Sequence, residues 1–263
     1  MNTVAKALAL VISLLFAGTV LRPAATAAGD EPPEEAKADA GDGPQTDTIK
    51  TSEGDLDVTF IGHGTLMFTF NKKVIHIDPW LKLSDYAKLP KADIILVTHE
   101  HRDHLDPAAI KRLRKKSTDI IANPAAARTI KGAAAMKNGE TKTVQGISIE
   151  AVPAYNQLHT RGHNLPWHPK GSGNGYVLTF GDKRVYVAGD TENTPEMKAL
   201  KKIYCAFLPM NVPYTMTPEM VADAAEAMKP VILYPYHYGK TDPQKLVELL
   251  KDSGIDVRVR NMR

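Results

Sequence analysis

Three histidines and three acids lie within ten residues in the segment 97–106, which reads VTHEHRDHLD. Four of these side chains form the pattern H-x-H-x-D-H: His99, His101, Asp103 and His104. Neutral imidazole is the commonest metal ligand in proteins, and carboxylate oxygens also bind zinc. Residues two apart in an extended segment point the same way, so His99 and His101 can bind one cation. Asp103 and His104 can serve a second. The alternative, a solvated polar loop, would carry a desolvation cost with nothing to offset it.

Two further candidate ligands follow other apolar segments. Asp190 ends the segment VYVAGD, and His237 follows the apolar run of VILYPYHYG. A single carboxylate such as Asp190 can bridge two cations about 3.5–4 Å apart. Two cations that share a water lower its pKa towards neutrality and supply hydroxide for a hydrolysis. The sequence therefore predicts a two-metal hydrolytic site, in which Asp103 is the catalytic residue that aligns the hydroxide and relays its proton.

The apolar segments predict the elements that must carry these loops. Hairpin strands are predicted over 58–61, 66–70 and 74–77, and a buried strand over 92–99. Later strands are predicted in the segments TDIIAN, ISIEAVPA, NGYVLTFGDKRVYVAGD, YCAFLPM, VILYPYHYG and IDVRV. Helices are predicted after Asp106-Pro107, over 124–133, after Thr217-Pro218 and in DPQKLVELLKDSG. Hairpins followed by strand–helix alternation indicate a layered α/β domain, with ligands at the C-terminal ends of strands.

The composition limits the class of protein. The 263 residues are 43 % hydrophobic and 24 % charged, which suffices for one sizeable domain or two small ones. A net charge of +3, without the aromatic and basic interleaving of a nucleic-acid groove, leaves a small molecule as the expected partner and excludes nucleic acid. Cys205 is the only cysteine, so no intrachain disulfide can form, and its apolar neighbours predict that it is buried.

The first 28 residues have the pattern of a secretory signal peptide. Lys6 precedes an apolar run over 7–21, and Ala25 and Ala27 form an A-x-A cleavage site. The apolar run is short for a membrane span, which favours cleavage over an uncleaved membrane anchor. The mature protein is therefore expected in the periplasm or outside the cell, without stable membrane insertion; the alternative is an N-terminal anchor.

Two further parts follow the predicted signal peptide. Residues 29–50 are rich in acids, proline and glycine, which predicts a disordered acidic linker. Residues 51–263 form the predicted hydrolase domain. Because the acids lie in the linker, this domain carries a net positive charge, which would suit an anionic substrate. Ordinary surface charge explains the same excess.

The H-x-H-x-D-H pattern resembles the metallo-β-lactamase superfamily, from about Asp57 to the C-terminus. That resemblance implies a four-layered αββα sandwich with a di-metal site, usually zinc, with manganese or iron as alternatives. The early GHGT and the ending YHYG are most similar to the subgroup of ascorbate-6-phosphate lactonases and N-acyl-phosphatidylethanolamine phospholipase D. The resemblance implies these positions: His99 and His101 on one metal, Asp103, His104 and His237 on the other, Asp190 as the bridge, and Asp78 in IHIDPW as a brace for the ligand loop.

One position departs from that family. A further histidine of the first metal usually follows the strand that here ends EAVPA, and this chain has Asn156 near that place. His159, His163 and His168 are the candidates to replace it. We favour His168, because HPKG lies nearest the following strand in a glycine-rich loop. His159 and His163 would line the pocket or bind nothing.

Two other histidines carry weaker signals. His63, between glycines in GHGT, either contacts the substrate or bonds to the backbone of its turn. His76 lies within a predicted strand and is expected to be structural.

The resemblance implies cleavage of an ester, lactone or phosphodiester bond, ahead of a β-lactam-type amide. A non-catalytic periplasmic zinc-binding protein is the alternative from another class. Asp103 and Asp190 argue against it, because a metal store needs neither an aligned base nor an open position. A redox di-iron role is disfavoured, since His101 stands where those relatives usually carry glutamate and no flavin-binding domain follows.

Overall fold

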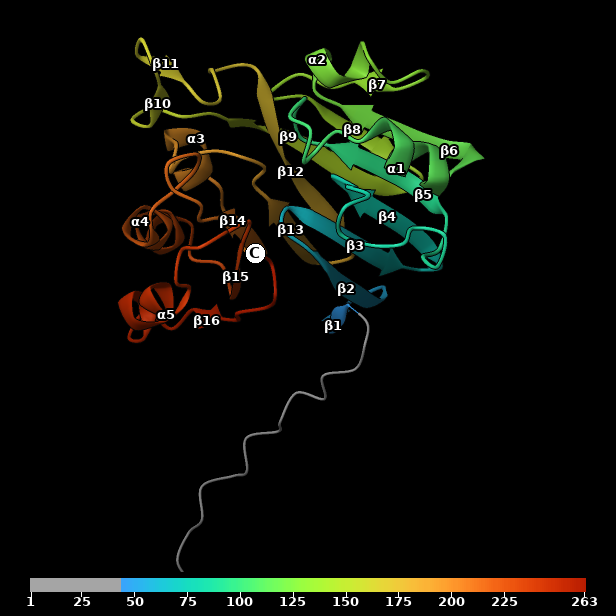
Figure 1. Cartoon of the computed structure of the whole chain (residues 1–263). Helices are drawn as coiled ribbons and strands as arrows, with labels where there is room; N and C mark the ends of the chain where they lie inside the picture. The colour runs from blue at the N-terminus through green and yellow to red at the C-terminus, as the bar shows by residue number, and fades with distance from the viewer. Residues whose placement is uncertain (1–43) are drawn as a thin grey trace, which may run out of the picture. The chain divides into compact units, whose positions relative to one another are not determined.

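The computed structural model describes residues 44–263. The predicted signal peptide and residues 29–43 of the predicted linker lie outside the described residues. Two seven-stranded sheets form the centre of the described part (Figure 1). The first contains, in sheet order, β1 (Gln45–Thr51), β2 (Gly54–Gly62), β3 (Thr65–Phe70), β4 (Lys73–Ile77), β5 (Ala92–Val97), β6 (Arg114–Ala122) and β7 (Ala134–Ala135).

The second sheet has a closely similar plan. Its order is β16 (Asp256–Val257), β15 (Ile232–Tyr236), β14 (Ile203–Pro209), β13 (Lys183–Val187), β12 (Gly173–Phe180), β9 (Ile147–Ala154) and β8 (Thr141–Val144). In each sheet an antiparallel part, β1 to β4 or β8 to β13, continues into parallel strands. A separate two-stranded hairpin joins β10 (Thr160–Arg161) and β11 (Leu165–Pro166).

The main core lies between the two sheets. Phe68 of β3 meets Phe180 of β12 with ring centroids 5.9 Å apart, and Phe60 of β2 meets Tyr234 of β15 at 4.9 Å. Burial of such aromatic side chains is a large stabilising contribution. Cys205 lies in this core, where burial raises the pKa of its thiol, as expected for an inert packed side chain.

Helices cover the outer faces, which confirms the four-layered αββα fold. A second apolar cluster joins α1 (Pro107–Leu113) and α2 (Pro124–Ala127) to the outer face of the first sheet. The other helices, α3 (Pro195–Lys198), α4 (Pro218–Met228) and α5 (Gln244–Leu250), lie against the second sheet (Figure 1). Asp106 and Thr217 cap α1 and α4 as predicted. Within residues 44–263, no helix has the length and apolar character needed to cross a membrane.

The predicted C-terminal boundary of the linker, at residue 50, is wrong. Residues 45–50 belong to β1, which pairs along its whole length with β2. Ile49 is only 2 % exposed and packs in the core. Asp47 accepts hydrogen bonds from Arg260 at 2.6 Å and from Tyr234 Oη at 2.6 Å. These contacts lie about two hundred residues away along the chain, so local composition could not reveal them.

Two predicted elements are shorter in the structure. The helix predicted over 124–133 begins at Pro124 but ends at Ala127, where Thr129 donates to the Ala126 carbonyl through both its backbone N–H and its hydroxyl. The strand predicted from IDVRV contains only Asp256–Val257, although the backbone N–H of Arg258 still donates to the Leu233 carbonyl at 2.8 Å.

His76 is fully buried in β4, as predicted for a structural residue, with its Nε2 3.1 Å from the Pro90 carbonyl. Burial lowers its pKa to about 4, and the hydrogen bond with Pro90 offsets this only in part. The unfolded chain takes up this proton near pH 6.5, so it binds more protons than the folded chain between about pH 6.5 and pH 4. Stability therefore falls as the pH falls through that interval.

Because of His76, we expect the free energy of unfolding of the metal-free protein to fall by about 2 kcal/mol when the pH is lowered from about 7 to 5. A His76→Gln variant, which keeps a donor for Pro90, should lose less over the same interval. Urea unfolding of both proteins with a chelator present measures the difference. Equal losses in the two proteins would contradict the assignment.

Candidate metal centre

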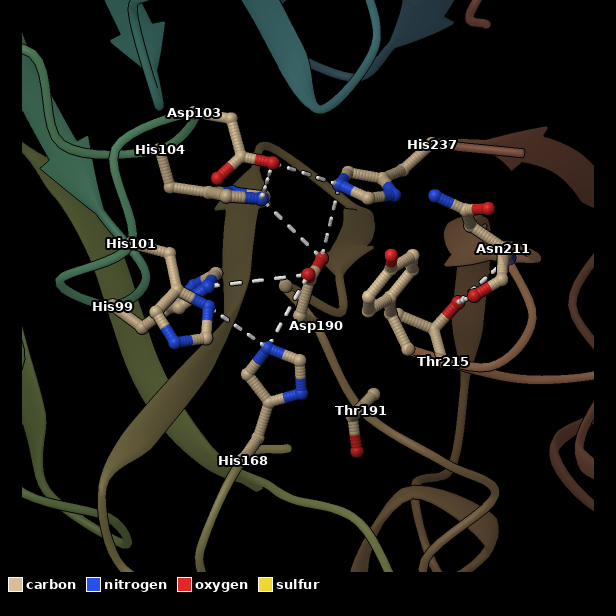
Figure 2. A network of polar contacts seen from close by, with 12 residues as sticks. His99, His101, Asp103, His104, His168, Asp190, Thr191, Asn211, Thr215 and His237 are labelled. Carbon is tan, nitrogen blue, oxygen red and sulfur yellow. Dashed lines mark hydrogen bonds and ion pairs between the residues drawn. The ribbon is translucent and has the colours of Figure 1, made fainter. Parts of the chain in front are cut away.

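The predicted ligands meet at one edge of the two sheets, where parallel strands end. Figure 2 shows Asp190 between two groups of side chains from both halves of the chain. The loop after β5 supplies four of them, and the loops after β13 and β15 supply Asp190 and His237. One ligand atom from each of His99, His101, His168 and Asp190 lies within 4.8 Å of the others. The same holds for His63, Asp103, His104 and His237.

Asp190 faces both groups, because each of its two carboxylate oxygens points toward a different group. Its Oδ2 lies 3.4 Å from Nε2 of His168 and 3.9 Å from Nε2 of His99. Its Oδ1 lies 3.4 Å from Nε2 of His104 and 3.6 Å from Nε2 of His237. The side chain is only 4 % exposed. This is the geometry of a carboxylate that can be shared between two cations.

Several buried polar atoms of this cluster have no hydrogen-bond partner among the described residues. They converge on the same two places: Nε2 of His99, Nε2 of His104, Nε2 of His237 and Oδ1 of Asp190. A buried polar atom without a partner costs about 1–3 kcal/mol. Divalent cations between these atoms would satisfy them, and a set of imidazole and carboxylate donors suits zinc. The residues present therefore fit two metal ions.

Asp78 fixes the orientation of one histidine in each group. Its Oδ2 accepts from His104 Nδ1 at 2.7 Å and from the Thr98 hydroxyl at 2.6 Å, and its Oδ1 accepts from Thr98 N at 2.8 Å. The Thr98 hydroxyl in turn lies 2.9 Å from His99 Nδ1. Both rings therefore use Nδ1 for support and keep Nε2 for a metal, which is how carboxylates commonly orient histidine ligands. Thr98, which precedes the first histidine, is a residue that the sequence analysis missed.

His168, the favoured candidate, lies in the first group, and Asn156 holds it there. Asn156 Oδ1 accepts from His168 Nδ1 at 2.6 Å and from His168 N at 3.0 Å. Its Nδ2 donates to Glu192 Oε1 at 3.1 Å and to the Tyr214 carbonyl at 2.9 Å. Asn156, which stands where the family usually has a histidine, thus orients His168, which takes the place of that histidine in the first group.

The structure separates the other two candidate histidines from both groups. His159 binds Glu192 through its backbone N–H at 2.6 Å, and its ring Nδ1 lies 2.9 Å from the same carboxylate. Burial would raise the pKa of Glu192, but backbone N–H donors and Asn156 lower it, so this carboxyl group is ionised. His163 is exposed in the turn between β10 and β11. Glu192, two residues after Asp190, also escaped the sequence analysis.

His63 contacts the second group directly. Its Nε2 lies 3.0 Å from Asp103 Oδ2, and its ring centroid is 3.8 Å from that of His237. Burial lowers the pKa of His63, so a neutral ring can donate Nε2–H to Asp103. Gly64, the next residue, leaves room for the His104 ring, because a Cβ there would lie 2.8 Å from that ring. Burial alone would raise the pKa of Asp103, but His237 and His63 hold it well below its usual value.

A pocket of about 530 Å³ opens beside both groups. Its walls include side chains that the sequence analysis did not assign to the site: Arg102, Arg161, Trp167, Asn211 and Tyr214. Asp103 is 34 % exposed at this pocket, whereas Asp190 is nearly enclosed. A bound molecule can therefore reach Asp103 from the pocket side.

Replacing Asn156 with leucine should weaken metal binding in the first group about 10- to 100-fold, because His168 loses the acceptor for its Nδ1. The second group should keep its affinity. Zinc titration against a chromogenic chelator measures both sites. Asn138→Leu is the matched control, since Asn138 bonds only to Gly173 and Asn174. Two unchanged affinities in Asn156→Leu would contradict the role of Asn156.

Comparisons with known proteins give a consistent result. The family model of the beta-lactamase superfamily domain matches residues 57–237. A UPF0173 metal-dependent hydrolase of Methanopyrus kandleri is 31 % identical over 222 residues, which cover 78 % of this chain and 95 % of that protein. The corresponding protein of Thermococcus kodakarensis is 32 % identical, with 75 % and 93 % covered. A crystal structure from Parabacteroides distasonis, assigned as a metal-dependent hydrolase, is 51 % identical with a TM-score of 0.81 and covers 84 % of this chain and 100 % of that one.

Proposed function

The chain belongs to the metallo-β-lactamase superfamily and is a metal-dependent hydrolase, and from this premise we propose that it cleaves an ester, lactone or phosphodiester bond with two divalent cations. The proposed ligands of the first cation are His99, His101 and His168, and those of the second are Asp103, His104 and His237. Asp190 is shared by both. We propose zinc, because nitrogen and carboxylate donors in such a cluster suit this ion.

The observation that carries this proposal is the position of Asp190. Each of its carboxylate oxygens lies within 3.4–3.9 Å of imidazole nitrogens of a different group. Bound cations would lower the pKa of a water molecule and polarise the bond to be cut. A protein that only stores metal has no need for one enclosed carboxylate between two ligand groups with an open pocket beside them.

Several side chains of this chain would then act on the reacting atoms or hold them. Asp103, at the open side of the second group, aligns the attacking water and accepts its proton. His63 fixes the carboxylate of Asp103 by a contact of 3.0 Å, so that the oxygen keeps one direction. His101 and His168 of the first group line the same pocket on its other side from Asp103, where they would hold the first cation. Preorganised groups of this kind need no rearrangement during the reaction.

The metal content of the full-length chain, purified without chelator, tests the proposal first. About two zinc ions per chain are expected, followed by turnover in a panel of esters, lactones, phosphodiesters and β-lactams. One metal or none, with added zinc not retained, would contradict the two-metal site. Two iron or manganese ions per chain would contradict zinc as the bound metal and would agree with the two-metal site. Turnover of β-lactams alone would favour an amide hydrolase, and two metals without any turnover would favour a metal-binding protein.

We also propose that the protein is exported. The support is the sequence of residues 1–28, with its basic start, short apolar run and A-x-A site. Expression of the full chain in a bacterium, followed by fractionation and mass spectrometry of the N-terminus, tests this. A mature chain that begins near residue 29 in the periplasm is expected. An intact N-terminus in the membrane fraction would favour an anchor.

A further inference from the structure

Two arginines beside the metal centre have no partner within residues 44–263. Arg102 follows His101 in the loop after β5, and Arg161 lies in β10; both are exposed and both line the pocket. Several other arginines of residues 44–263 are paired with carboxylates: Arg184 with Glu150, Arg258 with Asp256, and Arg260 with Asp47. A guanidinium group has a planar fork of donors that suits a carboxylate or a phosphate. The pocket therefore offers two unused anion-binding groups.

The hairpin that carries Arg161 is fixed at its base. The buried carboxylate of Glu192 accepts three consecutive backbone N–H groups, from Gln157 and Leu158 at 2.7 Å and from His159 at 2.6 Å. Hydrogen bonds to a charged acceptor are about twice as strong as those between neutral groups. Arg161 follows two residues later, so its backbone has a defined place beside the pocket.

The same wall of the pocket is aromatic. Trp167 and Tyr214 meet edge to face with ring centroids 4.7 Å apart, and both line the pocket. Six large apolar side chains of the described residues are exposed, and four of them lie in the two loops that supply this wall: Leu158, Leu165, Val212 and Tyr214. Of these four, Tyr214 lines the pocket, and the other three lie in the same two loops.

From these observations, and on the premise of the proposed hydrolysis, we propose a class of substrate. It is a small molecule with an anionic oxygen group, a carboxylate or a phosphate, that Arg102 and Arg161 bind. An apolar part of the same molecule packs against Trp167 and Tyr214. A pocket of about 530 Å³ has the size of a small-molecule site. The arginines supply specificity for charge, and the aromatic wall supplies most of the apolar contact.

Ligand binding to the metal-free protein tests the proposal without any turnover. The probes are 4-phenylbutyrate, its neutral amide, and 3-phenylpropyl phosphate, and the signal is the fluorescence of Trp167, one of only two tryptophans in the chain. We expect the acid to bind about tenfold more tightly than the amide. The preference should fall with added salt. The affinity for 3-phenylpropyl phosphate, compared with that for 4-phenylbutyrate, shows whether the arginines prefer a phosphate or a carboxylate.

Arg102→Gln and Arg161→Gln should each remove most of this preference. Arg112→Gln is the matched control, because Arg112 lies on α1 in an exposed pair with Asp85 and loses the same charge away from the pocket. No preference in the wild type, or the same preference in both pocket variants, would overturn the proposal. An equal loss in Arg112→Gln would do the same, since only total charge would then matter.

A second readout uses two esters with the same reacting bond, the 4-nitrophenyl monoester of adipic acid and 4-nitrophenyl hexanoate. The wild type should favour the charged ester in kcat/KM by about tenfold, and the ratio should fall in the two pocket variants. Turnover of both esters at one rate would overturn the substrate class and leave the hydrolase proposal intact. A preserved binding preference without turnover of either ester would uphold the substrate class and contradict an ester as the bond that is cut.

Discussion

Replacing Asp190 with asparagine should reduce the metal content from two ions to one or none and lower turnover about 10³-fold or more. Among the described residues, Asp190 is the one carboxylate whose two oxygens face different histidine groups, at 3.4 Å from His168 and 3.4 Å from His104. An amide has a single oxygen acceptor and no charge, so it cannot balance two cations. Metal analysis together with kcat measurement on the most active substrate found records the loss.

Asp223→Asn is the matched control for this change. Asp223 is half exposed and bonds Lys198 and Asn193 on the surface, so its replacement should leave both metals and activity unchanged. A surface ion pair of this kind contributes about 0–1 kcal/mol to stability. If Asp190→Asn kept two tightly bound ions and normal turnover, the shared carboxylate would not be the centre of the site.

Replacing Asp103 with asparagine should lower kcat about 10²- to 10⁴-fold while the fold stays intact. Asp103 is 34 % exposed, so the change removes a charge at the pocket wall without opening the core. The ligand atoms of the first group lie elsewhere, and their metal should remain bound. The two variants differ in the ions that they affect. Asp103→Asn should leave the ion of the first group bound, whereas Asp190→Asn should weaken the binding of both ions, because Asp190 faces both groups.

Thermal unfolding, metal content and kcat should be measured on the same Asp103→Asn preparation. A midpoint close to that of the wild type, with one metal retained, is expected. His63→Phe gives a graded comparison, since it removes only the contact of 3.0 Å that orients Asp103. It should lower kcat less than Asp103→Asn does. Normal turnover in Asp103→Asn would rule out the catalytic role of this carboxylate.

The sequence revealed those parts of the site that depend on local pattern. The H-x-H-x-D-H run, the aspartate after β13 and the histidine after β15 each follow an apolar strand, and the strands are short, buried and easily recognised. His168 was chosen among three candidates by its distance from the next strand. Its place in the first group has a physical cause that the sequence analysis did not identify, the pair of hydrogen bonds with Asn156.

The parts that escaped prediction depend on distant contacts. Glu192 binds three backbone N–H groups more than thirty residues earlier in the chain, and no local signal marks such an acceptor. Trp167 and Tyr214 form one wall although nearly fifty residues separate them. The strand β1 was hidden in an acidic segment, because its partners Arg260 and Tyr234 lie near the other end of the chain. Composition is a property of one segment, whereas each of these contacts joins two segments that are far apart in the chain.

The anchored hairpin has a consequence for how this protein can change. Its base, at Gln157 and His159, is held by Glu192, and the metal ligand that follows it, His168, is held separately by Asn156. Its turn, at His163 and Asn164, is exposed and makes no contact with the metal groups. Sequence drift in this hairpin can therefore alter substrate choice while the metal centre stays the same. A library varied over residues 160–166 is the natural starting point for directed evolution of new hydrolytic specificities on this scaffold.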